Sequence, residues 1–434
     1  MARLSSSFRT TFSPLKNPNF ALYFAGQGVS LIGTFMQQVA QQWLVWELTR
    51  DARMIGVASA LAFLPMLFLG PLSSALADRV DRRRLLIATQ IADMLLAFSL
   101  AALVVLGVKE VWPVLVLAGL LGVSSAFTTP AFSAFIGDLS GMAEVRSAYT
   151  IYGMVIETAR LLGPAIAGQI IASMGTAMAF ALNGLSFIAV IISLIIVRAQ
   201  QTRMVNRRNP LADFAASVRF MVRSPRMVDL LLCRIMVLLF IFSSLQLSAP
   251  IADQILRGGA DLAGNMLAAS GAGALVGALL VAPSFQQAKR AGVALCLALA
   301  WSGLWLVITS TFTSAPLMIF GIFMYSVMIP VVLTNVAALT LLLSPGDMRA
   351  RLAGALQMVS SGVQPLGALA VGWMGAVLGP LMALRVNGGL MMLIAFGMLA
   401  LSAGFRNWIP SAEPVDFVRP QASAALEGAL VEEV

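Results

Sequence analysis

Histidine does not occur anywhere in this chain of 434 residues. Histidine is the commonest proton shuttle, metal ligand and catalytic base near neutral pH, so any proton chemistry in this protein has to use carboxylates. Cysteine is nearly as scarce, since only Cys233 and Cys296 are present and both lie in apolar runs. Cysteines in such places are typical of packing residues, and we expect neither a disulfide framework nor a thiolate metal site.

Charged side chains are also few, at 11% of the chain, whereas hydrophobic residues make up 59%. A water-soluble domain could not bury that much apolar surface, so the composition indicates a membrane protein. A helix crosses the apolar core of a bilayer with about 20 residues. The sequence contains twelve apolar runs of this kind and therefore predicts an all-α membrane protein with twelve transmembrane helices. The predicted spans are 20–48, 54–77, 85–107, 112–136, 148–172, 177–197, 227–250, 261–283, 291–311, 315–342, 350–375 and 381–405.

Basic residues are distributed unevenly over the loops between these runs. If the N-terminus is cytoplasmic, the loops predicted outside contain only Arg50, Arg53, Lys109 and Arg257, and most other Lys and Arg residues lie inside. This asymmetry predicts that both termini are cytoplasmic. It also accounts for the net charge of +9 without a nucleic-acid partner. Because no small-residue cleavage site follows a short apolar segment, we expect the first helix to be retained.

The longest polar segment, 198–226, divides the predicted spans into two groups of six. Within it, Asn209 and Pro210 are cap and first-turn residues, and the apolar residues that follow recur on one helix face. We expect an amphipathic helix on the membrane surface there. The predicted organisation is a cytoplasmic N-terminal segment (1–19), a six-helix bundle (20–197), a linker (198–226), a second six-helix bundle (227–405) and a cytoplasmic tail (406–434).

The two halves show a weak internal repeat. A shift of 204 residues aligns Gly163 with Gly367, Gly168 with Gly372, Gly175 with Gly379, and Asn183 with Asn387. Parallel repeats of this kind occur in transporters whose substrate binds between the repeats near the membrane midplane. The repeat therefore predicts two pseudo-symmetric bundles around a central site.

The loop after the second span reads GPLSSALADRVDRRRLL, in which Asp78 is followed by four arginines. Charge-assisted hydrogen bonds among such side chains can fix a helix end against its neighbours. The stretch resembles the cytoplasmic loop signature of the major facilitator superfamily, G-x-L-A-D-R-x-G-R-R. The residues that match the signature are Asp78, Arg79, Arg82 and Arg83. Ser74 and Asp81 stand where the signature has glycines.

Further stretches extend the resemblance over about residues 17–405. NPNFALYFAGQGVSLIGTFMQQVAQQWLVWELT, FTTPAFSAFIGDL and ARLLGPAIAG resemble the first, fourth and fifth helices of a bacterial branch that includes the enterobactin exporter and macrolide and tetracycline efflux pumps. The resemblance implies a protein of the bacterial plasma (inner) membrane, in which the arginine loop is a conformational latch. An Asp on the fourth helix often joins that latch, and Asp138 is the matching position. Alternatively, the arginines only set topology and contact anionic lipids.

The fifth span contains a partial match to a Gly-Pro motif of drug antiporters, without the upstream glycines of the fuller motif. Gly163 and Gly168 permit close approach of another helix, and Pro164 frees a backbone carbonyl. The helix could therefore bend and seal a gate. Packing alone would account for the same residues.

Away from the first and last three residues of each predicted span, five residues are charged: Asp93, Glu157, Arg160, Arg234 and Arg385. A charge at a helix centre costs about 2.5–3.5 kcal/mol, so each requires a partner or a water-filled cavity. Glu157 and Arg160 lie deepest and share a helix face. Glu157 is either the ion-pair partner of Arg160 or a proton-carrying acid, for which Asp93 is the other candidate. Arg160 either braces neighbouring helices or binds substrate. The repeat places Gln357, Ser361 and Gln364 opposite 153, 157 and 160.

The first span carries four glutamines in FMQQVAQQW, namely Gln37, Gln38, Gln41 and Gln42. Amides that face lipid would lack hydrogen-bond partners, so we expect these side chains to face a cavity, with bonding between helices as the alternative. In the superfamily, the first, fourth, seventh and tenth helices line that cavity. Other polar candidates on these helices are Ser124, Ser125, Thr128, Thr129, Ser243, Ser244, Gln246, Tyr325, Ser326, Thr334 and Asn335.

Together these features predict a secondary transporter that rocks two bundles about a central site. The leading hypothesis is proton-driven export of an amphiphilic compound, drug-like or siderophore-like. The expected partners are a small-molecule substrate, protons and membrane lipids, with a monomeric protein, no nucleic acid and no cofactor. No phosphate-binding loop is present, and no catalytic set is recognisable, so we expect neither ATP-driven transport nor an enzyme. The alternatives are an importer or a lysophospholipid flippase on the same fold, and a non-transporting membrane scaffold or sensor.

Overall fold

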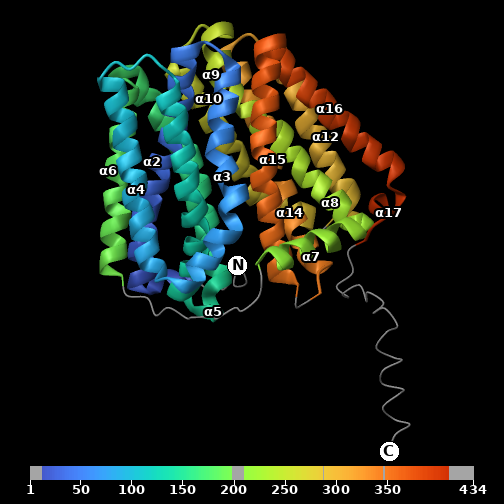
Figure 1. The fold of residues 1–434 in the computed structure, drawn as a ribbon. Helices are drawn as coiled ribbons and strands as arrows, with labels where there is room; N and C mark the ends of the chain where they lie inside the picture. The colour runs from blue at the N-terminus through green and yellow to red at the C-terminus, as the bar shows by residue number, and fades with distance from the viewer. Residues whose placement is uncertain (1–11, 198–209, 287, 346–347, 410–434) are drawn as a thin grey trace, which may run out of the picture.

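The computed structural model describes residues 12–197, 210–286, 288–345 and 348–409, and these residues are helical nearly throughout (Figure 1). The predicted segments at 1–11, 198–209 and 410–434 lie outside the described residues. In the described part, eleven helices are long and apolar enough to cross a membrane. The remaining predicted span corresponds to α2 (Pro18–Thr49), which has 32 residues and contains the four glutamines. The chain is therefore an integral membrane protein of the all-α class.

The first half begins with the short helix η1 (Ser13–Lys16) and continues through five long helices. These are α2 (Pro18–Thr49), α3 (Ala52–Arg79), α4 (Arg82–Val105), α5 (Trp112–Met174) and α6 (Thr176–Ile196). Helix α5 contains two spans, Trp112–Gly141 and Glu144–Met174, because Gly141 has a φ of 71° and breaks the helical path. A positive φ is cheap only for glycine, so this residue permits the turn between the fourth and fifth spans.

The second half begins with α7 (Pro210–Arg223) and contains six further spans. The seventh comprises α8 (Pro225–Met236), η2 (Val237–Phe242), η3 (Leu245–Leu247), α9 (Ser248–Pro250) and η4 (Ile251–Ile255), and the eighth comprises α10 (Ala260–Val276), η5 (Gly277–Val281) and α11 (Ala282–Gln286). The others are α12 (Ala291–Thr309), α13 (Ala315–Ser326) with α14 (Met328–Leu342), α15 (Arg349–Leu378), and α16 (Pro380–Leu401) followed by α17 (Ala403–Arg406).

The seventh span extends to Ile255, beyond the end predicted at 250. A proline usually ends or kinks a helix because it lacks a backbone N–H. Here the hydrogen-bond ladder is already irregular through η3, so Pro250 interrupts no regular α-helical turn. The π-helical turn η4 then continues the span.

The two halves stand side by side in Figure 1, with α7 at one end of the molecule and α9 at the other. We call these the α7 end and the α9 end. Helix α3 of the first half packs along α15 of the second, and α5 packs along α10. Two antiparallel seams therefore join the halves, and the space between the seams lies at the centre of the molecule.

The halves are pseudo-symmetric, as the internal repeat predicts. A Cβ placed on Gly168 would lie 2.9 Å from the carbonyl oxygen of Ala260, and one on Gly372 would lie 2.7 Å from that of Ala52. Each of these equivalent glycines thus allows its helix to touch the other half of the molecule. Likewise, Gly175 and Gly379 have the same φ of 85° at equivalent helix junctions.

Candidate functional site

A cavity of about 280 Å³ lies between the two halves. Helices of both halves contribute to its wall, which combines amides, a guanidinium, a proline and aromatic rings. Its lining residues are Phe35, Gln38, Val39, Gln42, Phe63, Arg160, Pro164, Leu238, Phe242, Ser243, Leu245, Gln246, Leu267, Ser270, Gln364 and Ala368. A mostly apolar pocket with a few polar groups suits an amphiphilic molecule.

Arg160 is the cationic group of this cavity. Its guanidinium carbon lies 5.7 Å from the ring centre of Phe35 and 5.6 Å from that of Phe242. Phe35 belongs to the first half and Phe242 to the second, so one cation interacts with aromatic rings of both halves. Such contacts stabilise a cation more strongly where water is excluded.

Glu157 pairs with Arg160 along the same helix. Nη1 of Arg160 donates to the two carboxylate oxygens of Glu157 at 3.3 and 3.4 Å. Charge-assisted hydrogen bonds are usually 2.7–2.9 Å long, so this pair is loose. The two side chains remain 25% and 21% exposed, respectively for Arg160 and Glu157. The guanidinium is therefore not fully engaged by its carboxylate and can interact with another polar group.

The glutamines of the first span divide between two environments. Gln38 and Gln42 line the cavity, and Nε2 of Gln42 donates to Oε1 of Gln246 at 2.8 Å. The hydroxyl of Ser59 donates to the same oxygen at 2.9 Å. Gln42 and Gln246 are 204 residues apart, so they are equivalent positions of the repeat and meet where the halves meet.

Gln37 lies away from the cavity, where it joins two helices of the first half. It is buried, and its Oε1 accepts a hydrogen bond of 2.6 Å from Nδ2 of Asn183 on α6. This contact corresponds to the alternative of bonding between helices. Gln41 is partly exposed and is not among the residues that line the cavity.

Three residues join the halves at the α9 end. Nε1 of Trp46 donates to a carboxylate oxygen of Asp253 at 3.1 Å, and Arg50 forms an ion pair with the same oxygen. The guanidinium of Arg50 also lies 5.9 Å from the centre of the Trp46 ring. We call this group, Trp46, Arg50 and Asp253, the α9 clasp. It connects the end of α2 to η4, beyond the cavity.

Sequence reasoning missed the α9 clasp because the seventh span was predicted to end at 250, which left Asp253 in a loop. One signal could have revealed it. The shift of 204 residues aligns Asp253 with Thr49, and Thr49 precedes Arg50 in the chain. An acid of the second half and a base of the first half therefore occupy adjacent positions of the repeat. Residues close to the pseudo-symmetry axis meet their own equivalents, as Gln42 and Gln246 do.

The Gly-Pro element of α5 forms the seam with α10. A Cβ on Gly271 would lie 2.7 Å from the carbonyl oxygen of Arg160, and Gly264 is in similarly close contact with that of Pro164. Because Pro164 has no N–H, the Arg160 carbonyl receives no hydrogen bond from that position in its own helix. Gly168 continues the same seam, whereas Gly163 packs against Phe35 of α2. The element thus places Arg160 in the cavity wall beside backbone of the other half.

The arginine loop ties together helices of the first half at the α7 end. Nη1 of Arg82 donates to both carboxylate oxygens of Asp138 at 3.0 and 2.9 Å, and these side chains are only 9% and 5% exposed. Arg83 donates to the carbonyl oxygens of Leu194 and Ile195 at the end of α6. Arg79 is exposed at the end of α3, and the side chain of Asp78 lies outside what the structure describes.

Several predicted site residues lie elsewhere. The described lining of the cavity does not include Asp93, Glu157, Arg234, Asn335, Gln357 or Ser361. Glu157 is linked to the cavity through its pair with Arg160. Arg234 donates to the Ser360 hydroxyl at 2.7 Å, Asn335 to the Val331 carbonyl at 2.7 Å, and Ser361 to the Gln357 carbonyl at 3.1 Å. Asp93 is buried in α4, and its Oδ1 has no hydrogen-bond partner among the described residues.

The hydroxyls predicted on the fourth and tenth helices also lie outside the described lining. Thr128 donates to the Ser124 carbonyl, Thr129 to that of Ser125, and Thr334 to that of Pro330. A hydroxyl that bonds the carbonyl four residues earlier is satisfied by its own helix. Such residues do not require a polar cavity, which is why their polarity was a poor guide to its lining.

Comparison with known proteins supplies the family context of this geometry. The sequence pattern of the transmembrane secretion effector family matches residues 9–427. Over 348 residues the chain is 26% identical to the uncharacterized MFS-type transporter YfiS of Bacillus subtilis, covering 78% of this chain and 81% of that protein.

Two other relatives match over shorter stretches. The staphyloferrin A transporter of Staphylococcus aureus is 28% identical over 174 residues, which is 40% of this chain and 44% of that protein. Macrolide efflux protein A of Streptococcus pyogenes is 34% identical over 118 residues, which is 26% of this chain and 28% of that protein.

The fold is similar to that of solved transporters. A bacterial homologue of the human lysosomal transporter Spinster, in an inward-facing and unoccupied conformation, superposes with a TM-score of 0.68. The match covers 91% of this chain and 99% of that structure at 14% identity. At that identity the likeness concerns the fold alone, and it is the fold of two six-helix bundles.

Proposed function

Because the chain belongs to the transmembrane secretion effector family of the major facilitator superfamily, we propose that it exports an amphiphilic organic compound by alternating access and proton antiport. The observation that carries the proposal is the cavity between the halves, in which Arg160, paired with Glu157 along the same helix, faces aromatic rings of both bundles. A staphyloferrin A transporter and a macrolide efflux protein among the relatives support an exported organic compound. The protein would act as a transporter and not as an enzyme.

The contacts between the halves support a conformation that is closed at the α9 end. The α9 clasp joins the halves beyond the cavity at that end, and the Gln42–Gln246 hydrogen bond and the glycine seams join them beside the cavity. The basic loops support cytoplasmic termini in a bacterial plasma membrane, so the α9 end would face outward. Release of substrate to the outside then requires these contacts to separate while the α7 end closes.

The charge of the Arg160–Glu157 pair supports antiport. With Glu157 ionised the pair is neutral, and the cavity accommodates a neutral or cationic amphiphile at little electrostatic cost. A proton on Glu157 leaves the Arg160 charge uncompensated, which repels a cationic substrate. Proton and substrate then oppose each other's binding, and this negative coupling is what exchange of one for the other requires. An anionic substrate would show the opposite coupling and a neutral one little coupling through charge, so we favour a cationic one.

An efflux assay tests the proposal. Expression in a bacterial host that lacks its main efflux pumps should raise tolerance to at least one hydrophobic compound of a broad panel, or increase the siderophore found in the medium. Arg160→Ala should abolish that gain. Gln357→Ala is the matched control, since this polar residue is exposed and lies outside the cavity lining. An unchanged panel with normal protein levels in the membrane would refute export.

A further inference from the structure

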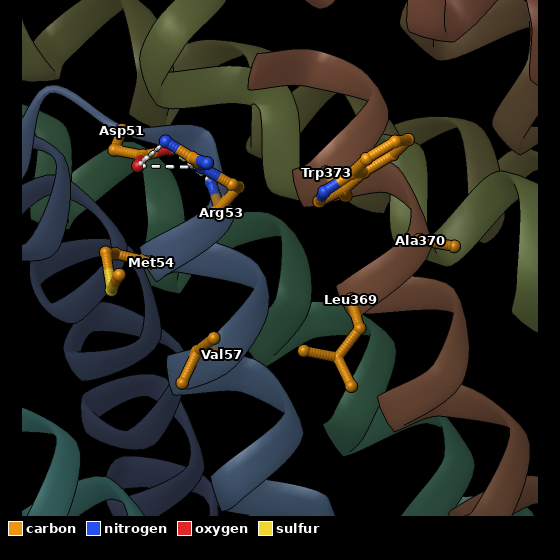
Figure 2. A pocket seen from close by; sticks show the side chains of 7 residues that line it. All are labelled: Asp51, Arg53, Met54, Val57, Leu369, Ala370 and Trp373. Carbon is orange, nitrogen blue, oxygen red and sulfur yellow. Dashed lines mark hydrogen bonds and ion pairs between the residues drawn. The ribbon is translucent and has the colours of Figure 1, made fainter. Parts of the chain in front are cut away.

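A second cavity, of about 710 Å³, lies where α3 and α15 meet near the α9 end (Figure 2). We call it the α3–α15 groove. Its lining residues are Asp51, Arg53, Met54 and Val57 of the first half and Leu369, Ala370 and Trp373 of the second. Arg53, Leu369, Ala370 and Trp373 are exposed, so the groove opens on the outside of the molecule. It is separate from the central cavity, with which it shares no lining residue.

The groove is polar at one end and apolar at the other along the helix axes. The apolar span of α3, Ala52–Gly70, starts next to Asp51, so the charged end lies where a bilayer's headgroup region begins. Val57 lies four residues further into the span than Arg53, about 6 Å deeper. In Figure 2, Val57 and Leu369 face each other across the groove below the level of Arg53 and Trp373. Its shape and polarity therefore match an amphiphile oriented like a membrane lipid.

The charged end of the groove is a paired site with no net charge. Nε of Arg53 donates to the two carboxylate oxygens of Asp51 at 3.1 and 2.9 Å. The side chains remain 54% and 22% exposed, so each can still bind a ligand. The side-chain hydrogen bond from Arg53 is the main cause that lowers the pKa of the Asp51 carboxyl. Asp51 is therefore ionised at neutral pH, and a ligand meets one positive and one negative group side by side.

We propose that the α3–α15 groove binds a phospholipid of the ethanolamine class. Its phosphate would bind Arg53, its ammonium would bind Asp51, and one acyl chain would lie against Trp373, Leu369 and Val57. An anionic headgroup without a cation would leave Asp51 facing negative charge. A choline headgroup balances the charge, but its quaternary nitrogen has no N–H to donate to the carboxylate. The ethanolamine headgroup satisfies both requirements.

Such a lipid would contact both halves of the protein where they touch. A Cβ on Gly56 would lie 2.5 Å from the carbonyl oxygen of Ala368, and Gly372 is in close contact with Ala52, so backbones of α3 and α15 meet beside the groove. Separation of the halves at the α9 end would pull these helices apart and divide the lipid site. A bound lipid should therefore favour the conformation described here over one open at the α9 end.

Lipid retention by the purified full-length protein tests this site. After removal of native lipid, the protein is mixed with equal amounts of phosphatidylethanolamine, phosphatidylcholine and phosphatidylglycerol that carry the same acyl chains, and bound lipid is measured by native mass spectrometry. We expect phosphatidylethanolamine to be retained in preference to both. Arg53→Gln should reduce its retention about tenfold, because one charge-assisted contact to phosphate is lost.

Two further variants separate binding from folding. Asp51→Asn keeps a side chain that can cap α3 but removes the charge, so it should abolish the preference for ethanolamine over choline. Trp373→Ala should weaken retention of all three lipids, whereas Trp112→Ala should not. Trp112 is a matched control, since it is 60% exposed against 61% for Trp373 and lies near the same end but outside the groove.

Equal retention of the ethanolamine and choline lipids by the natural protein would refute the site, as would identical losses in Trp373→Ala and Trp112→Ala. The measurement needs no transport, so its result is independent of the proposed export function.

Discussion

The ion pair beside the central cavity joins Arg160, which lines the cavity, to Glu157, which does not. Arg160 is charged in any state of the protein, because a guanidinium does not lose its proton in proteins. In the proposed antiport, a proton on Glu157 changes the net charge of the pair. Coupling to a proton gradient through this pair would therefore depend on Glu157, while Arg160 carries the charge that the carboxylate compensates.

Glu157→Gln should abolish proton-driven transport but spare exchange of substrate down its own gradient. The amide keeps the size of the side chain and mimics the protonated state, so the cavity remains and its proton dependence is lost. Transport into proteoliposomes with and without a proton gradient measures both activities.

Asp93→Asn provides the comparison for that measurement, since Asp93 is the other candidate proton-carrying acid, is buried in α4 and does not pair with Arg160. If driven transport survives in Glu157→Gln and fails in Asp93→Asn, the proton site belongs to Asp93 instead.

Asp253 of the α9 clasp is a second residue with a predictable effect. Asp253→Asn keeps an acceptor for Trp46 but removes the charge that holds Arg50. At a partly exposed pair this costs about 1 kcal/mol, which corresponds to about a fivefold shift toward the state open at the α9 end. Spin labels at Lys109→Cys and Arg257→Cys, which lie at that end in opposite halves, report the shift by their distance distribution.

Glu110→Gln is the control for that experiment. Glu110 is an exposed acid at the same end that hydrogen-bonds Trp112 within the first half. An equal shift in both variants would mean that surface charge, and not the α9 clasp, sets the equilibrium. The two native cysteines are buried, which favours selective labelling of introduced ones.

Helices, in contrast to these single side chains, were largely predictable from the sequence. The apolar runs identified the spans because a run of about twenty residues without charge has the length and composition of a transmembrane helix. Irregular turns within the spans were not predictable. The seventh span changes from α-helix to a π-helical turn at Val237–Phe242, which helps to place Phe242 beside Arg160. Apolar periodicity does not distinguish a π turn from an α turn over six residues, so the position of such a side chain has to come from the structure.

The seam between α5 and α10 depends on small residues, because the backbones of the two helices are in contact there. Gly271→Ala would place a methyl group 2.7 Å from the Arg160 carbonyl oxygen, closer than Cβ atoms come to a backbone oxygen in real structures. The helices must then separate, at a cost of about 1–3 kcal/mol. We expect a lower midpoint of thermal unfolding and a marked loss of transport.

Gly119→Ala is the matched variant on α5, since no atom lies within 4 Å of a Cβ at that glycine. It should be neutral or slightly stabilising, because alanine reduces the freedom of the unfolded chain. If Gly271→Ala and Gly119→Ala lose transport equally, then transport does not depend on the close packing of α5 against α10 at Gly271.

The whole molecule was predictable as an architecture but not as a site. The repeat of 204 residues predicted two equivalent bundles, and pairs such as Gly168 and Gly372 occupy equivalent places in the structure. The cavity, however, combines residues far apart in the sequence, such as Arg160 with Phe242. Polarity alone selected Gln38 and Gln246, which line the cavity, and also Asn335, which bonds its own helix. Which polar side chains line the cavity depends on how the two halves are placed relative to each other.

The hydrogen bond between Gln42 and Gln246 has a bearing on how such a molecule could arise. In a dimer of identical six-helix chains, one glutamine on the twofold axis would meet its own copy, and either amide could donate. Here the direction is fixed, because Ser59 also donates to Gln246 while the equivalent position in the other half is Ala263, which has no hydroxyl. Fusion of two copies into one chain allows each to mutate alone. A single serine is then enough to give a symmetric contact between two identical halves a fixed direction.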